Sequence, residues 1–499
     1  MSVLKANIKR DRSVPFFVVC LALLLSLPLS AQKVEYNQNM QQAFDDLFSL
    51  KIDRFQAALK NERRNNPQNK AADYLEAAYL FINMFVNEDE VYFTKQKARL
   101  DELQTSISEL DKSNPYRLLY LGELKLATAT LEGKFGNRLK AAFQFYSAHN
   151  TLKENYTKYP DFVLNYIPMG VLYAAIGSLP QDYQNMAGVI GIEGDISEGV
   201  SLIKKGYWYC LSEDSLRFHK DFNGFIYSYI SHQLGTGNIS PESLSLDFKS
   251  NLFLGYMQVL IWNSEGKVKP AVELLEKQLN SIQGIEIPYL HYMLGKIALP
   301  VAPETSLKAL NKYLALNKTG NYKKSTYRYL AWYYLLKDDA AQVEVYRKKV
   351  LNEGEHSLGA DKQALREARE GWLKPLVQAR LYFDGALYQK GLDVLNAMKI
   401  DDLNANQTSE YYYRKGRCLQ EMNQKTAAIS AFKAAVSVEG AESTYALGNS
   451  ALQLALLYES KKQYEQASVY FKKTLEISGY PFYEGVHQKA KTGLDRIKG

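Results

Sequence analysis

Residues 411–440, YYYRKGRCLQEMNQKTAAISAFKAAVSVEG, predict a pair of antiparallel helices. Gly416 is a small residue within the first helix, and Gln424 lies in the turn. Three residues then follow at intervals of four and three, on one face of the second helix: Ala428, Phe432 and Ala435. One such hairpin cannot bury its apolar face alone, so hairpins of this kind are expected to stack on one another.

The same spacing recurs in three units of the chain. In each unit the small residue of the first helix precedes that of the second by 12 positions; the pairs are Gly416 and Ala428, Ala455 and Ala467, and Ala379 and Gly391. Small residues at a crossing point let two helices approach closely, and an aromatic residue such as Tyr458 fills the space beside them. We find no convincing alternation typical of strands, so the sequence predicts an all-α fold.

Weaker units of the same kind extend upstream. Gly295 leads to Ser306 and Leu310, whereas Ala331 leads to a second helix that we expect to be short, around residues 343–350. Three X-Pro pairs predict helix boundaries: Asn66-Pro67, Asn114-Pro115 and Tyr159-Pro160. We therefore expect helical hairpins over most of the chain.

The order small, Tyr, small, Phe, small resembles the tetratricopeptide-repeat (TPR) superfamily, whose unit has about 34 residues. The resemblance implies a right-handed α-solenoid of stacked antiparallel helical hairpins. The first small residues of the three best units are Ala379, Gly416 and Ala455. The interval from each one to the next is slightly longer than one TPR unit. Met398 and Thr474 also replace the last small residue. We interpret these units as divergent repeats with longer loops.

The domain prediction follows from these patterns. We expect a divergent TPR-like helical region at residues 32–250, TPR-like repeats at 251–480, and a capping helix at 481–499.

Residues 170–206 depart most from the repeat. Gly170 opens a hairpin, but the matching small residue, Gly199, comes 29 positions later, because a glycine-rich insertion at 177–194 intervenes. Leu179-Pro180, an apolar stretch, Gly194-Asp195 and a later Glu198-Gly199 before a helix resemble the eukaryotic inclusion-body-clearance and outer-membrane TPR family. A small-ligand receptor or an enzyme built around the insertion is the alternative to a binding scaffold.

The first residues have the pattern of a secretory signal peptide. Four basic residues precede an apolar run at 14–29, and Ser30-Ala31-Gln32 follows. The run is short of the roughly 20 residues that span a bilayer, so we expect cleavage after Ala31 rather than a retained anchor. Together with few Cys and much Tyr and Asn, this resembles exported proteins of Bacteroidetes-type bacteria and predicts a periplasmic or envelope location.

Composition and motifs argue against several classes of function. Cleavage after Ala31 lowers the net charge from +7 to +4, too little to predict nucleic-acid binding. The six His have no metal-ligand spacing, and the chain has no nucleophile elbow or phosphate-binding loop. We expect no metal, no cofactor and no enzyme activity. We also expect no transmembrane span after cleavage, with peripheral envelope association left open.

The remaining expectation is a protein or peptide partner. First-helix faces that the packing does not use carry seven candidates for partner binding: Arg328, Trp332, Arg380, Phe383, Tyr413, Arg417 and Gln420. Arg and aromatic residues are favoured at interaction hot spots, and we expect a concave face that holds an extended segment or an amphipathic helix. The alternative is that the aromatic residues pack between helices. In TPR domains that hold a C-terminal carboxylate, Asn stands where Arg380 and Arg417 stand here, so that mode is not expected.

Cleavage of the signal peptide is directly testable. We expect N-terminal sequencing of the protein from its native source to begin at Gln32. A sequence that begins at Met1 or Ser2 would show that residues 14–29 are retained.

Overall fold

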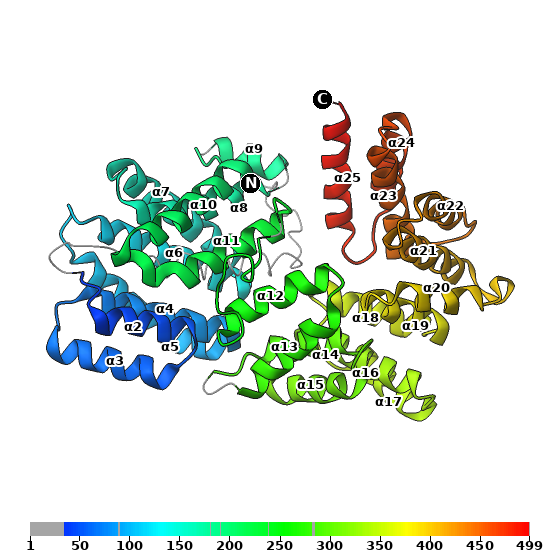
Figure 1. Cartoon of the computed structure of the whole chain (residues 1–499), viewed down its shortest axis with the longest axis horizontal. Helices are drawn as coiled ribbons and strands as arrows, with labels where there is room; N and C mark the ends of the chain where they lie inside the picture. Colours follow the sequence, from blue (N-terminus) through cyan, green and yellow to red (C-terminus); the bar gives the residue numbers. More distant parts are fainter. Residues whose placement is uncertain are drawn as a thin grey trace. The chain divides into compact units, whose positions relative to one another are not determined.

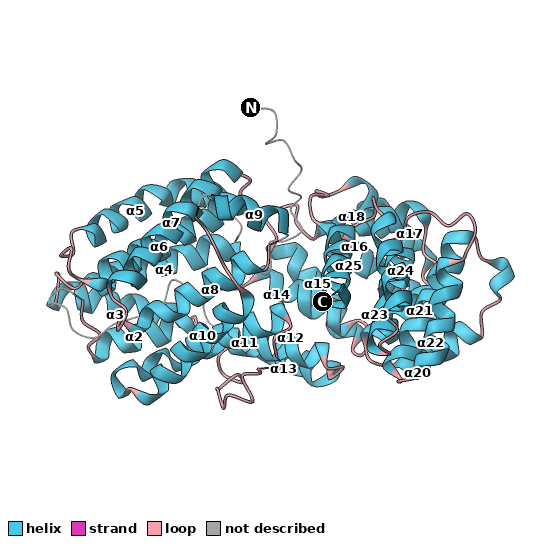
Figure 2. Cartoon of the chain, turned by 90° about the horizontal axis from the view of Figure 1, so that it is seen from above, coloured by secondary structure: helices cyan, strands magenta, loops and turns pink. Residues whose placement is uncertain are grey.

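The fold is all-α. The computed structural model describes residues 34–87, 90–179, 181–189, 191–237, 239–281 and 285–498, and the predicted signal peptide lies outside them. Within these ranges there are 24 α-helices, α2–α25, three short 3-10 helices and no β-strand (Figures 1 and 2). The predicted fold class is confirmed.

In the N-terminal half, most helices pack as successive pairs. The pairs are α2 (Gln38–Phe48) with α3 (Ile52–Asn65), α4 (Lys70–Asn87) with α5 (Glu90–Ser108), α6 (Pro115–Lys134) with α7 (Arg138–Lys158), and α8 (Tyr166–Gly177) with α10 (Ile196–Ser212). In the chain, α9 (Gln181–Val189) lies between α8 and α10, and α11 (Lys220–Leu234) packs on α10.

Pairing continues in the C-terminal half. The helices are α12 (Leu252–Ser264), α13 (Val268–Ser281), α14 (Pro288–Ala298), α15 (Pro303–Leu316), α16 (Lys323–Leu336), α17 (Ala340–Asn352), α18 (Gly359–Glu370), α19 (Lys374–Asp384), α20 (Tyr388–Asn396), α21 (Ala405–Glu421), α22 (Lys425–Val436), α23 (Tyr445–Ser460), α24 (Tyr464–Glu476) and α25 (Tyr483–Lys498). The last helix, α25, packs on α23 and α24. The expectation of a short second helix after Ala331 is wrong, because α17 is as long as α24, with 13 residues.

The chain forms two compact units. Among the described residues, the N-terminal unit contains 34–265 and 273–290, and the C-terminal unit contains 266–272 and 291–498. The boundary predicted at residue 250 falls within the N-terminal unit.

Close helix crossings at small residues organise both units. In the N-terminal unit, a Cβ on Gly170 would lie 2.6 Å from the carbonyl oxygen of Gly199, so α8 and α10 touch backbone to backbone. This confirms that Gly170 and Gly199 belong to one hairpin despite the long insertion. The helices can approach this closely because neither residue has a side chain.

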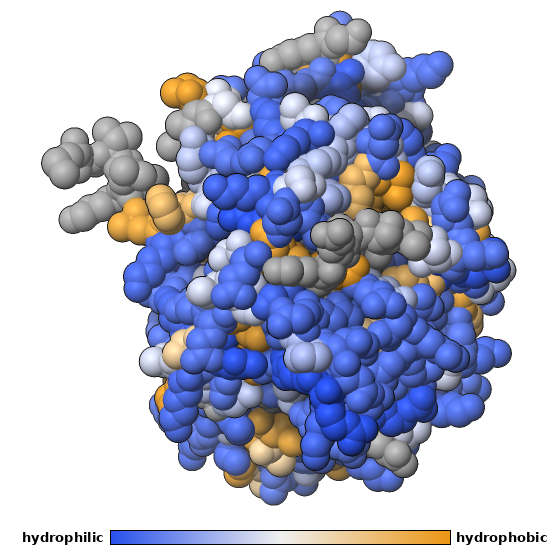
Figure 3. Space-filling model, turned by 90° about the vertical axis from the view of Figure 1, so that its left-hand side faces the viewer, coloured by the Kyte–Doolittle hydropathy of each residue, from blue (hydrophilic) through white to orange (hydrophobic). Residues whose placement is uncertain are grey.

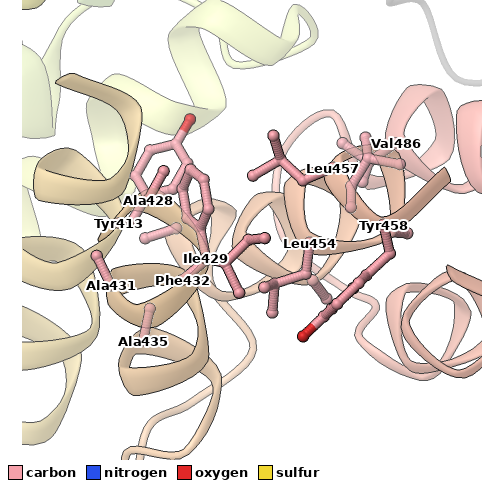
Figure 4. Packing of buried hydrophobic residues seen from close by; sticks show 14 of the residues in the cluster. Tyr413, Ala428, Ile429, Ala431, Phe432, Ala435, Leu454, Leu457, Tyr458 and Val486 are labelled. Atoms are coloured by element: carbon pink, nitrogen blue, oxygen red, sulfur yellow. The ribbon is translucent and has the colours of Figure 1, made fainter. Parts of the chain in front are cut away.

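The C-terminal unit uses the small residues that define the repeat. Gly416 lies against the ring of Phe432, to which a Cβ would come within 2.6 Å. Ala428, Ala455 and Ala467 are completely buried. Around them the apolar side chains of α21–α25 form one continuous core (Figure 4). The predicted crossing points are confirmed.

A left-handed residue closes the turn of six hairpins. One residue after the C-cap of the first helix has φ between 57° and 87°; these residues are Leu50, Gly136, Asp338, Ala386, Asn423 and Lys462. The next backbone N–H then donates back to the last turn of the first helix, as from Gln424 to the Leu419 carbonyl at 2.8 Å. This is the Schellman arrangement, which satisfies carbonyls left open at a helix end.

Tyrosines pair across the hairpins. The ring centroids of Tyr334 in α16 and Tyr346 in α17 lie 5.6 Å apart, with 14° between the ring planes. Tyr458 in α23 and Tyr470 in α24 repeat this pair at 5.7 Å and 9°. Stacked rings in the same place in two hairpins show that part of the tyrosine content serves packing within the hairpin.

The predicted X-Pro boundaries are confirmed. Helix α3 ends one residue before Asn66 and α7 one residue before Tyr159, whereas α6 begins at Pro115. The Asn114 side chain caps α6 by accepting from the Tyr116 N–H at 3.0 Å. Proline suits the first helical position because its missing N–H would be unpaired there.

The contribution of a left-handed turn residue to stability can be tested at an exposed site. Lys462 has φ 59°, a conformation that costs an L-residue roughly 1–2 kcal/mol and glycine almost nothing. We expect Lys462→Gly to raise the free energy of unfolding by about 1 kcal/mol, measured by urea unfolding followed with circular dichroism.

The neighbouring residue provides the matched control. Lys461 has φ −92°, a conformation open to any residue. Lys461→Gly therefore relieves no strain and only increases the conformational entropy that the chain loses on folding. We expect it to lower stability by roughly 0.5–1 kcal/mol. Equal effects of the two changes would contradict the role of the left-handed turn.

Candidate partner-binding site

The seven predicted residues lie on three first helices of the C-terminal unit. Arg328 and Trp332 belong to α16, Arg380 and Phe383 to α19, and the other three, Tyr413, Arg417 and Gln420, to α21. The small residues at the crossings of these helices are Ala331, Ala379 and Gly416. Each predicted residue lies three positions before, one position after or four positions after the small residue of its own helix. Equivalent helical positions on successive hairpins place them along one side of the stacked helices.

A shared carboxylate joins α16 to α19. The guanidinium of Arg328 lies 3.2 Å from Glu367 Oε2, and that of Arg380 lies 2.8 Å from Glu367 Oε1. Gln363, one turn earlier on α18, also donates to Oε1 at 2.7 Å. The charge of Asp384 also raises the pKa of Arg380, so two carboxylates act on the two arginines.

Trp332 lies between the two arginines of this cluster. The Cζ atoms of Arg328 and Arg380 each lie 4.8 Å from its ring, and Arg328 also lies 4.7 Å from the ring of Tyr329. Cation–π contacts of this kind are worth roughly 0.5–2 kcal/mol and hold the guanidinium planes in place. The aromatic rings therefore orient the arginines.

A second arginine contact joins α19 to α21. The Cζ atom of Arg417 lies 4.6 Å from the ring of Phe383, and its guanidinium lies 3.3 Å from Glu421. Gln420 continues the series by donating to Gln453 of α23 at 2.9 Å. The structure thus connects side chains from four successive first helices.

Burial divides the predicted residues into two groups. Arg328, Trp332 and Tyr413 are buried, at 3%, 1% and 3% exposure. The other four are half-buried: Arg380, Phe383, Arg417 and Gln420. The Arg380 and Arg417 side chains are 21% and 23% exposed. The buried three support the surface from beneath, as the packing alternative anticipated for aromatic residues, and only the half-buried four are open to a partner.

Sequence reasoning missed Glu367, the centre of the cluster. It lies on α18, a helix that follows the α16–α17 hairpin and does not fit the two-helix repeat. Asp361, on the same helix, accepts from the backbone N–H groups of Tyr322 and Ser325 at 2.7 and 2.9 Å and so fixes α18 at the start of α16. The Gln363 and Glu367 spacing of four was the available signal, but such pairs occur on many solvated helices.

Electrostatics favour the ionised form of Glu367. Burial opposes its ionisation, but the guanidinium groups of Arg328 and Arg380 and the hydrogen bond from Gln363 outweigh it and lower its pKa to about 2. For Arg380, burial acts against the charged form, yet Glu367 raises its pKa above the usual value. All three groups are therefore charged at neutral pH.

Unpaired polar atoms surround the same side chains. Among the described residues, buried atoms without a hydrogen-bond partner include five on α16, α18 and α21: Arg328 Nε, Trp332 Nε1, Gln363 Oε1, Arg417 Nε and Gln420 Oε1. Unsatisfied buried donors and acceptors are uncommon and each costs roughly 1–3 kcal/mol. Similar buried atoms also occur in the N-terminal unit, so the five by themselves do not identify a binding site.

The glycine-rich insertion is held by backbone contacts at both ends. A Cβ on Gly177 would lie 2.7 Å from the Ile196 backbone nitrogen, and one on Gly194 would lie 2.6 Å from the Tyr173 carbonyl oxygen. Gln184 donates to the Gly177 carbonyl at 2.9 Å.

Two other features are absent from the described part of the chain. There, no three His, Cys, Asp or Glu side chains come together in a way that could hold a metal ion. No helix within these ranges is both long and apolar enough to cross a membrane. Cys210 and Cys418 are buried free thiols.

The fold defines a class, the helical-hairpin repeat proteins. Residues 409–441 and 449–480 match the family model of the tetratricopeptide repeat. The TPR prediction is confirmed, and the chain carries TPR repeats in α21–α24. No curated protein matches the chain. TPR repeats are typical of protein-interaction scaffolds and usually non-catalytic. The likeness of residues 170–206 to the outer-membrane TPR family stays a prediction.

The cluster makes stability depend on one carboxylate. Removing one partner of a buried ion pair leaves the other charge uncompensated, so we expect Glu367→Gln to lower the free energy of unfolding by about 3 kcal/mol. The matched control is Glu370→Gln on the same helix, whose exposed pair with Arg366 is worth less than about 1 kcal/mol. Urea unfolding of both variants measures the difference.

The pH dependence of the same variant tests the mechanism. Because the folded pKa of Glu367 is lowered from 4.5 to about 2, its contribution is complete above pH 5 and is lost as pH falls towards 2. We expect the stability difference between wild type and Glu367→Gln to shrink by about 3 kcal/mol over this range. A constant difference would rule out the paired arginines as its cause.

Proposed function

We propose that the protein is an exported, non-catalytic scaffold that binds another protein or peptide through the first-helix face of the C-terminal unit. The observation that carries the proposal is the half-buried surface formed by Arg380, Phe383, Arg417 and Gln420 across α19 and α21. It overlaps the matched TPR repeats, and TPR repeats bind protein partners.

The chemistry of these side chains suits a peptide ligand. Arg and aromatic residues dominate interaction hot spots because they combine large contact area with directed hydrogen bonds. Here Arg417 makes a cation–π contact with Phe383. Arg380 makes a cation–π contact with Trp332 and a salt bridge with Glu367. Side chains already fixed by the protein lose little entropy on binding, which favours affinity.

The type of ligand follows from the spacing of the surface. Successive first helices present one set of side chains each, so an extended segment or an amphipathic helix can contact several sets in turn. The partly exposed guanidinium of Arg380 can donate to a carboxylate or an exposed carbonyl of the ligand at that point.

Export belongs to the proposal because of the N-terminal sequence. Four basic residues, the apolar run and Ser30-Ala31-Gln32 support delivery to the periplasm or cell envelope. We infer that the partner is itself an envelope protein, since the two must meet in the same compartment.

Site-specific crosslinking tests the binding surface. A photoreactive phenylalanine analogue at Phe383 or at Gln420 should give a covalent adduct with the same envelope protein. Arg417→Ala should lower the amount of this protein retained in affinity capture about tenfold, as for a hot-spot arginine, without changing helicity. Trp332 is left intact because its burial makes it part of the core.

The control position is Val469, which is 60% exposed on the second helix α24. The analogue at Val469 should give no adduct with that protein. Adducts at Val469 alone, or full retention by Arg417→Ala, would contradict binding through the first-helix face.

A further inference from the structure

The N-terminal half of α7 exposes a line of large apolar side chains. Leu139, Phe143 and Tyr146 are 80%, 70% and 38% exposed. Their spacing of four and three places them on one face of the helix. Large exposed apolar residues are scattered elsewhere, and the face in Figure 3 is mainly hydrophilic. This line is therefore an exception that the fold does not require.

The same part of α7 contributes little to the core. Its buried residues, Ala148, His149, Leu152 and Asn155, all lie in the second half. From 138 to 147 no side chain is buried. Burial against α6 therefore fixes the second half, and the first half carries its apolar face outward.

The charged residues in the N-terminal half of α7 are all basic. Arg138 and Lys140 are exposed beside the apolar line, and Lys134 precedes it at the end of α6. Between 138 and 153 there is no acidic residue, and Glu154 is the only acidic residue in α7. An apolar face flanked by Lys and Arg is the pattern of helices that bind at the surface of an anionic membrane.

We propose that the N-terminal half of α7 binds the surface of an anionic lipid membrane. Leu139, Phe143 and Tyr146 would enter the boundary between headgroups and acyl chains, while Arg138 and Lys140 contact lipid phosphates. A second copy of the chain is a poorer occupant, because symmetric pairing of this face would bring its basic residues together. The surface belongs to the N-terminal unit, whereas the proposed partner-binding face belongs to the C-terminal unit.

Vesicle sedimentation tests the proposal with the chain that begins at Gln32, which contains every residue the structure describes. We expect binding to phosphatidylcholine vesicles that contain phosphatidylglycerol as a minor anionic component, and much weaker binding to phosphatidylcholine alone. Leu139→Ser with Phe143→Ser should lower binding at least tenfold. Arg138→Ser or Lys140→Ser should each lower it about fivefold, since one basic residue near an anionic surface is worth roughly 1 kcal/mol.

The control pair is Val345→Ser with Val469→Ser, which removes exposed apolar side chains from the C-terminal unit. It should bind as wild type does, and circular dichroism should show equal helicity for all variants. Equal losses in the two double variants, or unchanged binding without Leu139 and Phe143, would overturn the proposal. Failure to bind either kind of vesicle would also overturn it, with an acidic protein as the next occupant to test.

Discussion

The close approach of two helices at small residues is the constraint on which the structure depends. At Gly170 and Gly199 the backbones themselves touch, and at Gly416 the ring of Phe432 occupies the space a side chain would take. Close crossing fixes the angle and depth of each hairpin, and therefore the face it offers to the next. Where the connection between the two helices is short, as at Asn423 after α21, a left-handed residue closes the turn.

The arginine cluster depends on the same constraint. Arg380 directly follows Ala379, and Arg417 directly follows Gly416, so each arginine begins beside a crossing point and is directed away from it. The irregular helix α18 then places Glu367 between two regular hairpins. A regular repeat would leave Arg328 and Arg380 as two like charges near one another. The carboxylate of Glu367 forms a salt bridge with each arginine and so offsets their repulsion.

The sequence was informative where spacing alone determines structure. The constant interval between paired small residues identified the crossing points, and Asn114-Pro115 identified a helix start, because these depend on local geometry. The left-handed turns could not be predicted, since Leu50, Ala386 and Lys462 adopt a conformation that local propensity disfavours. Glu367 was missed for a related reason: its role comes from two partners on other helices. Burial of Trp332 and Tyr413 also depended on stacking that spacing does not encode.

The tyrosine-rich composition follows from these requirements. A hairpin that crosses at glycine or alanine leaves a gap beside the crossing, and a flat ring fills it at little cost in side-chain entropy. Tyr334 with Tyr346 and Tyr458 with Tyr470 fill it with stacked pairs. In the N-terminal unit Tyr74 and Tyr120 stack at 3.9 Å, while the Tyr74 hydroxyl donates to buried Glu123. Phenylalanine would fill the gap but would leave such a carboxylate without that donor. A fold of small crossing residues that also buries polar groups thus favours tyrosine over phenylalanine at these positions.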